Sequence, residues 1–127
     1  MHELSIIHSI LETTEQELRS RGNGYAVEAI ELEIGELAGV EISTLEFLWP
    51  AAVEQTVLEK AGWHITRIPG KARCHDCGAL FTMQQYYDPC PECGSHLAHI
   101  TSGEELRIKS LTLVSREVPA EIPQNWN

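Results

Sequence analysis

The sequence predicts an α/β fold in which two helices pack on a three-stranded sheet, with a cysteine-containing module inserted before the last strand. Three observations lead to this prediction. Apolar residues follow helical spacing near the N-terminus, an alternation of period two replaces it from residue 25, and all four cysteines fall within residues 71–103. A length of 127 residues suits one core with a small insert.

The first predicted element is an amphipathic helix over residues 3–21. Its apolar positions recur at helical spacing and are Leu4, Ile7, Leu11 and Leu18, with Ile10 beside them. Gly22 and Gly24 predict its end. His8 lies on the apolar flank, so we expect a packed histidine there.

A strand with one solvent-facing side follows over residues 25–34, where Ile30, Leu32 and Ile34 alternate with acidic residues. A second helix is predicted to begin near Ser43, which has capping-box spacing with Glu46. Pro50 should kink or interrupt this helix because proline lacks an amide hydrogen.

Two further strands are predicted. One covers residues 63–68 and ends at Pro69-Gly70; the other covers residues 104–114. In the latter the apolar phase slips after Ile108, which predicts a β-bulge near Lys109-Ser110. We therefore expect a discontinuous α/β domain (residues 1–70 plus 104–118), a cysteine module (residues 71–103) and a flexible tail (residues 119–127).

The formal net charge of −10 excludes several functions. Nucleic-acid binders need a basic face, and acidity disfavours anionic membranes, so neither partner is expected. The chain has no apolar run long enough to span a membrane, and its start, Met1-His2-Glu3-Leu4-Ser5, is unlike a secretory signal. We expect a cytoplasmic protein.

The cysteines form two C-x-x-C-G turns, Cys74 to Gly78 and Cys90 to Gly94. Such turns present two sulfurs each to one ion, and four thiolates match a closed tetrahedral zinc site. Iron in a rubredoxin-like site is the alternative, and a disulfide pair is disfavoured in a reducing cytoplasm. A closed site leaves no position for catalysis, so the predicted module is a structural zinc ribbon.

His75, His96 and His99 lie within or beside this module and are expected to be exposed, with exchange of one for a thiolate at low pH as the alternative. His2 offers different chemistry. The amino group of Met1, the amide and imidazole of His2 and the amide of Glu3 form a nitrogen-rich set that favours Ni(II) or Cu(II). Taken alone, however, a histidine at position two is usually a chance polar residue before a helix.

Taken together, the opening Met1-His2-Glu3, the segment from Leu32 to Glu41, both cysteine turns and the segment from Glu105 to Leu111 resemble the HypA/HybF hydrogenase maturation factors. The resemblance covers residues 1 to about 114. It implies nickel delivery to [NiFe] hydrogenase with a HypB-type GTPase and the hydrogenase large-subunit precursor as partners.

The resemblance also implies the site residues. Nickel would be the cargo, bound by Met1, His2 and Glu3, and Glu41 matches an acidic position that some members use. Structural zinc would be held by the matching cysteines, which are Cys74, Cys77, Cys90 and Cys93. Some relatives carry a histidine directly after a cysteine pair, where this chain has glycine, which speaks against ligand exchange.

Three other functions are the alternatives. A zinc-ribbon protein of transcription or RNA processing needs a basic or aromatic face, and an iron electron carrier would be coloured. A hydrolase would need a Ser-His-Asp set, an HExxH motif or paired carboxylates, none of which the sequence offers. The chain is therefore not expected to be an enzyme.

Overall fold

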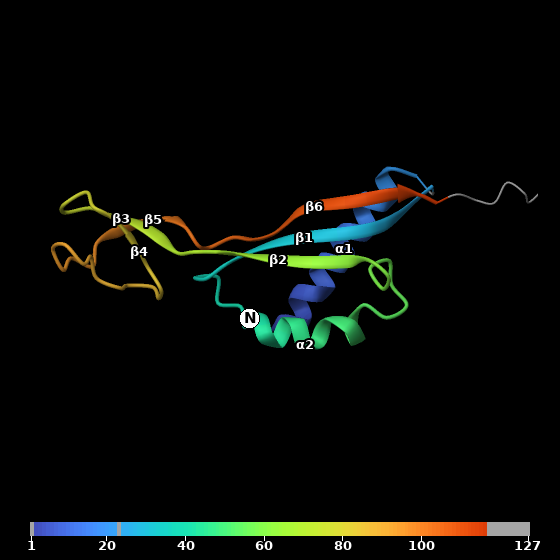
Figure 1. The fold of residues 1–127 in the computed structure, drawn as a ribbon, viewed down its shortest axis with the longest axis horizontal. Coiled ribbons are helices and arrows are strands. Elements are labelled where there is room, and N and C mark those ends of the chain that lie inside the picture. Colours follow the sequence, from blue (N-terminus) through green and yellow to red (C-terminus); the bar gives the residue numbers. More distant parts are fainter. Residues whose placement is uncertain (1, 23, 117–127) are drawn as a thin grey trace, which may run out of the picture.

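The computed structural model describes residues 2–22 and 24–116. Met1 and the predicted tail lie outside the described residues. The elements, in chain order, are α1 (Glu3–Ser20), β1 (Tyr25–Gly35), α2 (Ile42–Ala52), β2 (Gly62–Ile68), β3 (Lys71–Cys74), β4 (Leu80–Thr82), β5 (Ala98–Ser102) and β6 (Leu106–Ser115). Figure 1 shows an elongated molecule with a larger sheet and both helices at one end and a smaller sheet at the other. None of the described helices is long and apolar enough to cross a membrane.

The larger sheet has three strands in the order β2-β1-β6, with β2 parallel and β6 antiparallel to β1. This confirms the predicted sheet. Glu31 pairs with Ser110 and Leu32 with Ile108, so Lys109 is an extra residue in β6. The predicted β-bulge is confirmed, and a second register shift falls between Val27 and Ala29 in β1.

Both helices pack against one face of this sheet, where the alternation of β1 buries its apolar side chains. Trp49 of α2 is 2% exposed and stacks on Trp63 of β2, with ring centroids 4.8 Å apart. The buried residues of α1 are Ile6, Ile7, Ile10, Leu11 and Thr14. Two expectations for α1 were wrong, because Leu4 and His8 are exposed. The buried stripe includes Ile6 and Thr14 and leaves these two side chains outside it.

Helix α2 differs from its prediction at both ends. Its N-cap is Glu41, not Ser43, and the predicted capping box is wrong because no side-chain cap is formed. The helix continues through Pro50 and ends at Ala52, only two residues later. Because Pro50 cannot donate to the carbonyl one turn earlier, it weakens the last turn, and turns rather than helix follow over residues 53–60.

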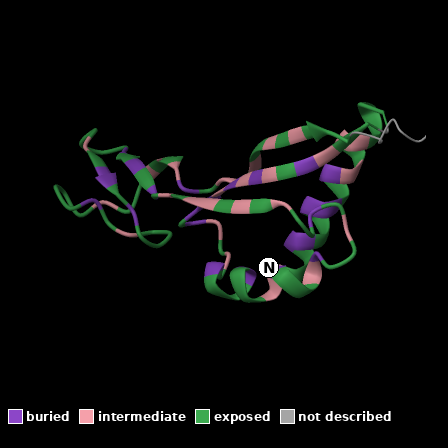
Figure 2. Ribbon diagram, turned by 45° about the vertical axis from the view of Figure 1, so that its right-hand side comes forward, coloured by how far each residue is buried: buried purple, intermediate pink, exposed green. Residues whose placement is uncertain are grey.

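The smaller sheet is made of three short strands, β4-β3-β5, all antiparallel. The sequence did not predict these strands, which are three to five residues long. The inner face of this sheet packs with residues from the neighbouring loops in a second small core. Its buried members are Leu37, Ala72, Cys74, Phe81, Met83 and Cys90. Figure 2 shows how few residues are buried at this end of the molecule.

Three glycines form the junction between the two sheets. A Cβ on Gly35 would lie 1.9 Å from the carbonyl oxygen of Gly103, and one on Gly103 would lie 2.5 Å from the Cα of Gly70. Gly103 also has φ +111°, which favours glycine. The loop after β1 inserts Leu37, which is 4% exposed, into the second core. The backbone segments therefore cross in direct contact, with Leu37 wedged beside them.

Candidate metal centre

Two matching turns position the four cysteines. The Gly78 amide donates to the Cys74 carbonyl at 3.0 Å, and the Gly94 amide donates to the Cys90 carbonyl at 2.7 Å. Gly78 has φ +77° and Gly94 has φ +76°, a backbone conformation that favours glycine. The glycine of the C-x-x-C-G pattern therefore meets a local backbone requirement. Cys74 and Cys90 are buried, whereas Cys77 and Cys93 are exposed.

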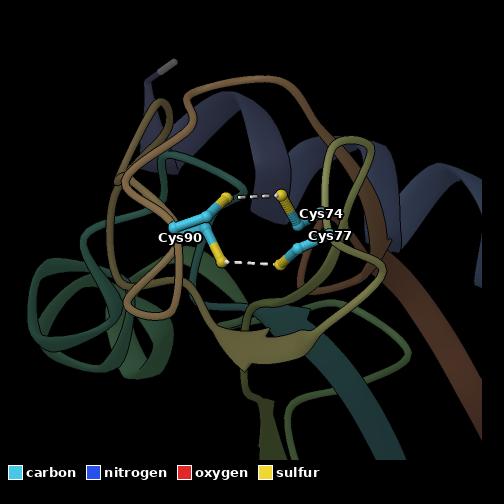
Figure 3. A group of neighbouring side chains, drawn as sticks. Cys74, Cys77 and Cys90 are labelled. Atoms are coloured by element: carbon cyan, nitrogen blue, oxygen red, sulfur yellow. Dashed lines mark hydrogen bonds between the residues drawn. The ribbon is translucent and has the colours of Figure 1, made fainter.

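The four sulfurs converge from these turns (Figure 3). Cys74 Sγ lies 3.5 Å from Cys93 Sγ, Cys77 Sγ lies 3.7 Å from Cys90 Sγ, and all four lie within 4.8 Å of one another. A tetrahedral zinc ion with bonds of about 2.3 Å holds its sulfur ligands about 3.8 Å apart. The donor set and spacing therefore fit a closed four-thiolate metal site.

The thiols are electrostatically coupled. A hydrogen bond from the Cys77 amide is the main cause that lowers the pKa of Cys74 to about 7. The Ser95 amide acts in the same direction on Cys93, but neighbouring Cys74 and burial outweigh it and raise the pKa of Cys93 to about 12. The neighbouring thiols thus act in opposite directions on one another's ionisation, and a bound cation would favour the thiolate form of all four.

The nearby histidines lie outside this group. Among the described side chains, the four cysteines are the one set of three or more His, Cys, Asp or Glu residues close enough to share an ion. His75 and His99 are exposed as expected. His96 is exposed too, and its Nδ1 lies 2.8 Å from the Tyr87 carbonyl, so this nitrogen is the donor.

Two of the residues predicted for nickel, His2 and Glu3, lie at the start of α1. His2 is its exposed N-cap, and Glu3 occupies the first turn. A Glu3 carboxylate oxygen accepts a hydrogen bond from the Glu41 amide at 2.9 Å, although the two residues are 38 positions apart in sequence. This bond is the main cause that lowers the pKa of Glu3. The start of α1 is therefore held beside the start of α2.

This contact is the part of the site that the sequence did not predict. Glu41 was expected as a metal ligand, but its backbone amide is also the anchor for Glu3. The Glu41 carboxylate accepts a hydrogen bond from the Ser43 hydroxyl at 3.4 Å. The side chains of His2, Glu3 and Glu41 do not form a ready-made cluster of the kind that the cysteines form.

Known proteins resemble this chain along most of its length. Residues 1–113 match the family described as hydrogenase/urease nickel incorporation, metallochaperone, HypA. The hydrogenase maturation factor HypA of Parabacteroides distasonis is 48% identical over 113 residues, which cover 89% of this chain and 97% of that protein. HypA of Geobacter metallireducens is 45% identical over 111 residues, which cover 87% and 97%.

A solved structure agrees with these matches. The solution structure of the nickel metallochaperone HypA from Helicobacter pylori superposes with a TM-score of 0.64 at 26% identity, covering 91% of this chain and 99% of that one. The family match over residues 1–113 includes α1, the larger sheet up to residue 113 and both cysteine turns. The chain belongs to the HypA family of nickel metallochaperones that act in hydrogenase maturation.

Proposed function

We propose that this chain binds Ni(II) through Met1, His2 and Glu3 at its N-terminus, with Glu41 beside them, and delivers it to [NiFe] hydrogenase. The observation that carries the proposal is the hydrogen bond between the Glu3 carboxylate and the Glu41 amide. It anchors the first helical turn against the start of α2, so that the N-cap residues of the two helices, His2 and Glu41, lie at the same end of the domain.

The exposed position of His2 suits a site that must release its cargo. The His2 carbonyl accepts the first helical hydrogen bond, which the Ile6 amide donates, but the side chain of His2 is exposed. Nickel ligands drawn from one imidazole, a terminal amine and backbone nitrogens can thus be exchanged without disturbing either core. The amine must lose its proton, with a pKa of about 7.7–8, so nickel affinity should rise with pH.

We propose zinc as the resident ion of the cysteine cluster. It would be held by Cys74, Cys77, Cys90 and Cys93, and its role is structural because four protein ligands close the coordination sphere. Iron fits the same sulfurs, but it would give the purified protein strong visible absorption. Metal analysis together with an absorption spectrum separates the two ions.

Delivery requires partners. We infer that a HypB-type GTPase and the hydrogenase large-subunit precursor supply and receive the nickel, in the cytoplasm. The chain acts as a carrier without catalysis of its own. Thiolates offered by the receiving protein would replace the nitrogen ligands by exchange, which the exposure of His2 permits.

The test is a nickel titration by calorimetry on tag-free, zinc-loaded protein. His2→Ala and a form with two residues added before Met1 should both lose tight binding of one nickel ion. His8→Ala is the matched control, since His8 is an exposed histidine of the same helix. If the extended form binds nickel as tightly as the natural one, the nickel site lies elsewhere in the chain.

The role of Glu41 is tested separately. Glu41→Gln leaves the backbone amide that anchors Glu3 in place but removes the carboxylate. We expect weaker nickel binding from Glu41→Gln and no change from Glu46→Gln, an exposed residue of the same helix. Equal affinity in both variants would limit the contribution of Glu41 to its backbone.

A further inference from the structure

The outer face of the smaller sheet is basic. Direct cross-strand partners share a face, so Arg73 of β3 lies between Leu80 of β4 and His99 of β5. Lys71 lies two residues before Arg73 and pairs with Thr82, in the next row of the same face. The intervening row, with Ala72 and Phe81, points into the second core. The outer rows contain no carboxylate.

This face is uncovered. Lys71, Arg73 and His99 are exposed, and Leu80 is 66% exposed. The ion pairs found among residues 2–22 and 24–116 join Arg21 to Glu17 and Arg107 to Glu33, so neither cation of β3 is neutralised within that part of the chain. Two unneutralised cations and an apolar side chain thus stand together on a chain whose net charge is −10.

The first C-x-x-C-G turn, Cys74 to Gly78, holds the side chain of Arg73 in place. Arg73 Nη1 donates to the Gly78 carbonyl at 3.2 Å, which holds the guanidinium over the Cys74–Cys77 turn. The remaining guanidinium donors stay available, and a planar fork held in place loses little entropy when it binds a carboxylate. The arrangement is a partly preorganised binding surface.

We propose that this basic face, defined by Lys71, Arg73, Leu80 and His99, docks an extended acidic segment of a partner protein. Two residues along a strand span about 6.6 Å, so Lys71 and Arg73 match carboxylates on alternate residues of an extended peptide. Leu80, next to Arg73 on β4, supplies an apolar contact beside the charges. This proposal depends on the proposed function in one respect, which is that a protein that delivers nickel must bind a partner.

An acidic polypeptide fits this face better than a nucleic acid. Single-stranded nucleic acids are bound by aromatic stacking along a basic groove, and no Phe, Tyr or Trp lies in the outer rows. The net charge of −10 would repel a long polyanion, whereas a short acidic segment meets mainly the local cations within the screening length of about 8–10 Å.

The experiment measures fluorescence anisotropy of a labelled twelve-residue peptide of alternating Glu and Thr, titrated with the zinc-loaded full chain at two salt concentrations. We expect saturable binding that weakens at high salt. The double variant K71E/R73E should bind at least tenfold more weakly, because it replaces attraction by repulsion at both positions. The matched control is K60E/K109E, which changes the net charge equally at two exposed lysines outside the smaller sheet. It should stay within twofold of wild type.

Several results would overturn the proposal. These are the absence of saturable binding, an equal loss in both double variants, or tighter binding of an oligonucleotide of the same length. Zinc content and circular dichroism verify folding, and K71Q/R73Q, which adds no acidic group, should show an intermediate loss. Nickel calorimetry on K71E/R73E should match wild type, so failure of the docking face and failure of the nickel site are distinguished.

Discussion

Replacing the buried Gly35 with alanine should destabilise the protein more than the same change at the exposed Gly39 or Gly62. The added Cβ would lie 1.9 Å from the Gly103 carbonyl oxygen and 2.7 Å from the Glu104 nitrogen. Both neighbours are backbone atoms, so no side-chain rotation can relieve the contact. The two segments must move apart by about 1.5 Å to reach ordinary van der Waals contact at 3.4 Å.

The magnitude follows from the hydrogen bonds that span this contact. The Gly35 amide donates to the Glu105 carbonyl at 2.7 Å, and the Leu37 amide donates to the Gly103 carbonyl at 2.8 Å. A buried backbone group left without a partner costs about 1–3 kcal/mol, so losing both bonds costs about 2–6 kcal/mol. That is a large part of the usual unfolding free energy of about 5–15 kcal/mol.

Urea denaturation of zinc-loaded protein, followed by helical circular dichroism, measures the change. Gly39→Ala is the first control, since φ is +78° but no atom lies within 4 Å of the added Cβ, and about 1–2 kcal/mol is expected. Gly62→Ala is the second, with its nearest atom at 3.8 Å, and it should be neutral or more stable by about 0.4–1 kcal/mol. If Gly35→Ala proves no worse than Gly39→Ala, the junction is not the rigid contact inferred here.

Three further outcomes are expected. Trp49→Ala should cost about 3–5 kcal/mol in urea denaturation, since it removes a buried indole and its stack on Trp63; a cost below 1 kcal/mol would contradict the stacked core. Removing zinc with a chelator should abolish the amide protection of the smaller sheet while helical circular dichroism persists, because the helices belong to a separate core; simultaneous loss of both signals would refute this. The Glu41 amide keeps the pKa of Glu3 below its usual 4.5, so its contribution to stability is complete above that pH and is lost as pH falls through the lowered pKa. The stability advantage of wild type over Glu3→Gln should therefore shrink between pH 7 and pH 3 in urea denaturation, and a constant difference would rule out this linkage.

Much of the larger sheet could be predicted because its signals are local. The alternation of Ile30, Leu32 and Ile34 indicated β1, and the phase slip after Ile108 predicted a bulge near Lys109-Ser110, where Lys109 is the extra residue. The cysteine ligands were equally readable, since a C-x-x-C-G turn specifies its own backbone geometry. In each case a few neighbouring residues determine the structure.

The features that were missed depend on contacts between distant segments. The strands of the smaller sheet are too short for alternation to be visible, and the crossing of Gly35, Gly70 and Gly103 joins three separate turns. The Glu3–Glu41 hydrogen bond likewise requires the relative placement of two helices. Leu4 and His8 were misplaced because the face of α1 that is buried depends on where α2 packs.

The bulge at Lys109 also bears on how the protein behaves at high concentration. Strand β6 is ten residues long and forms one edge of its sheet, so its outer backbone groups offer a template for a strand of another molecule. Lys109 interrupts the regular spacing of these groups and places an exposed ammonium near the middle of the edge. A second strand would have to desolvate that charge and match an irregular register, so the bulge acts as a barrier to edge-to-edge aggregation.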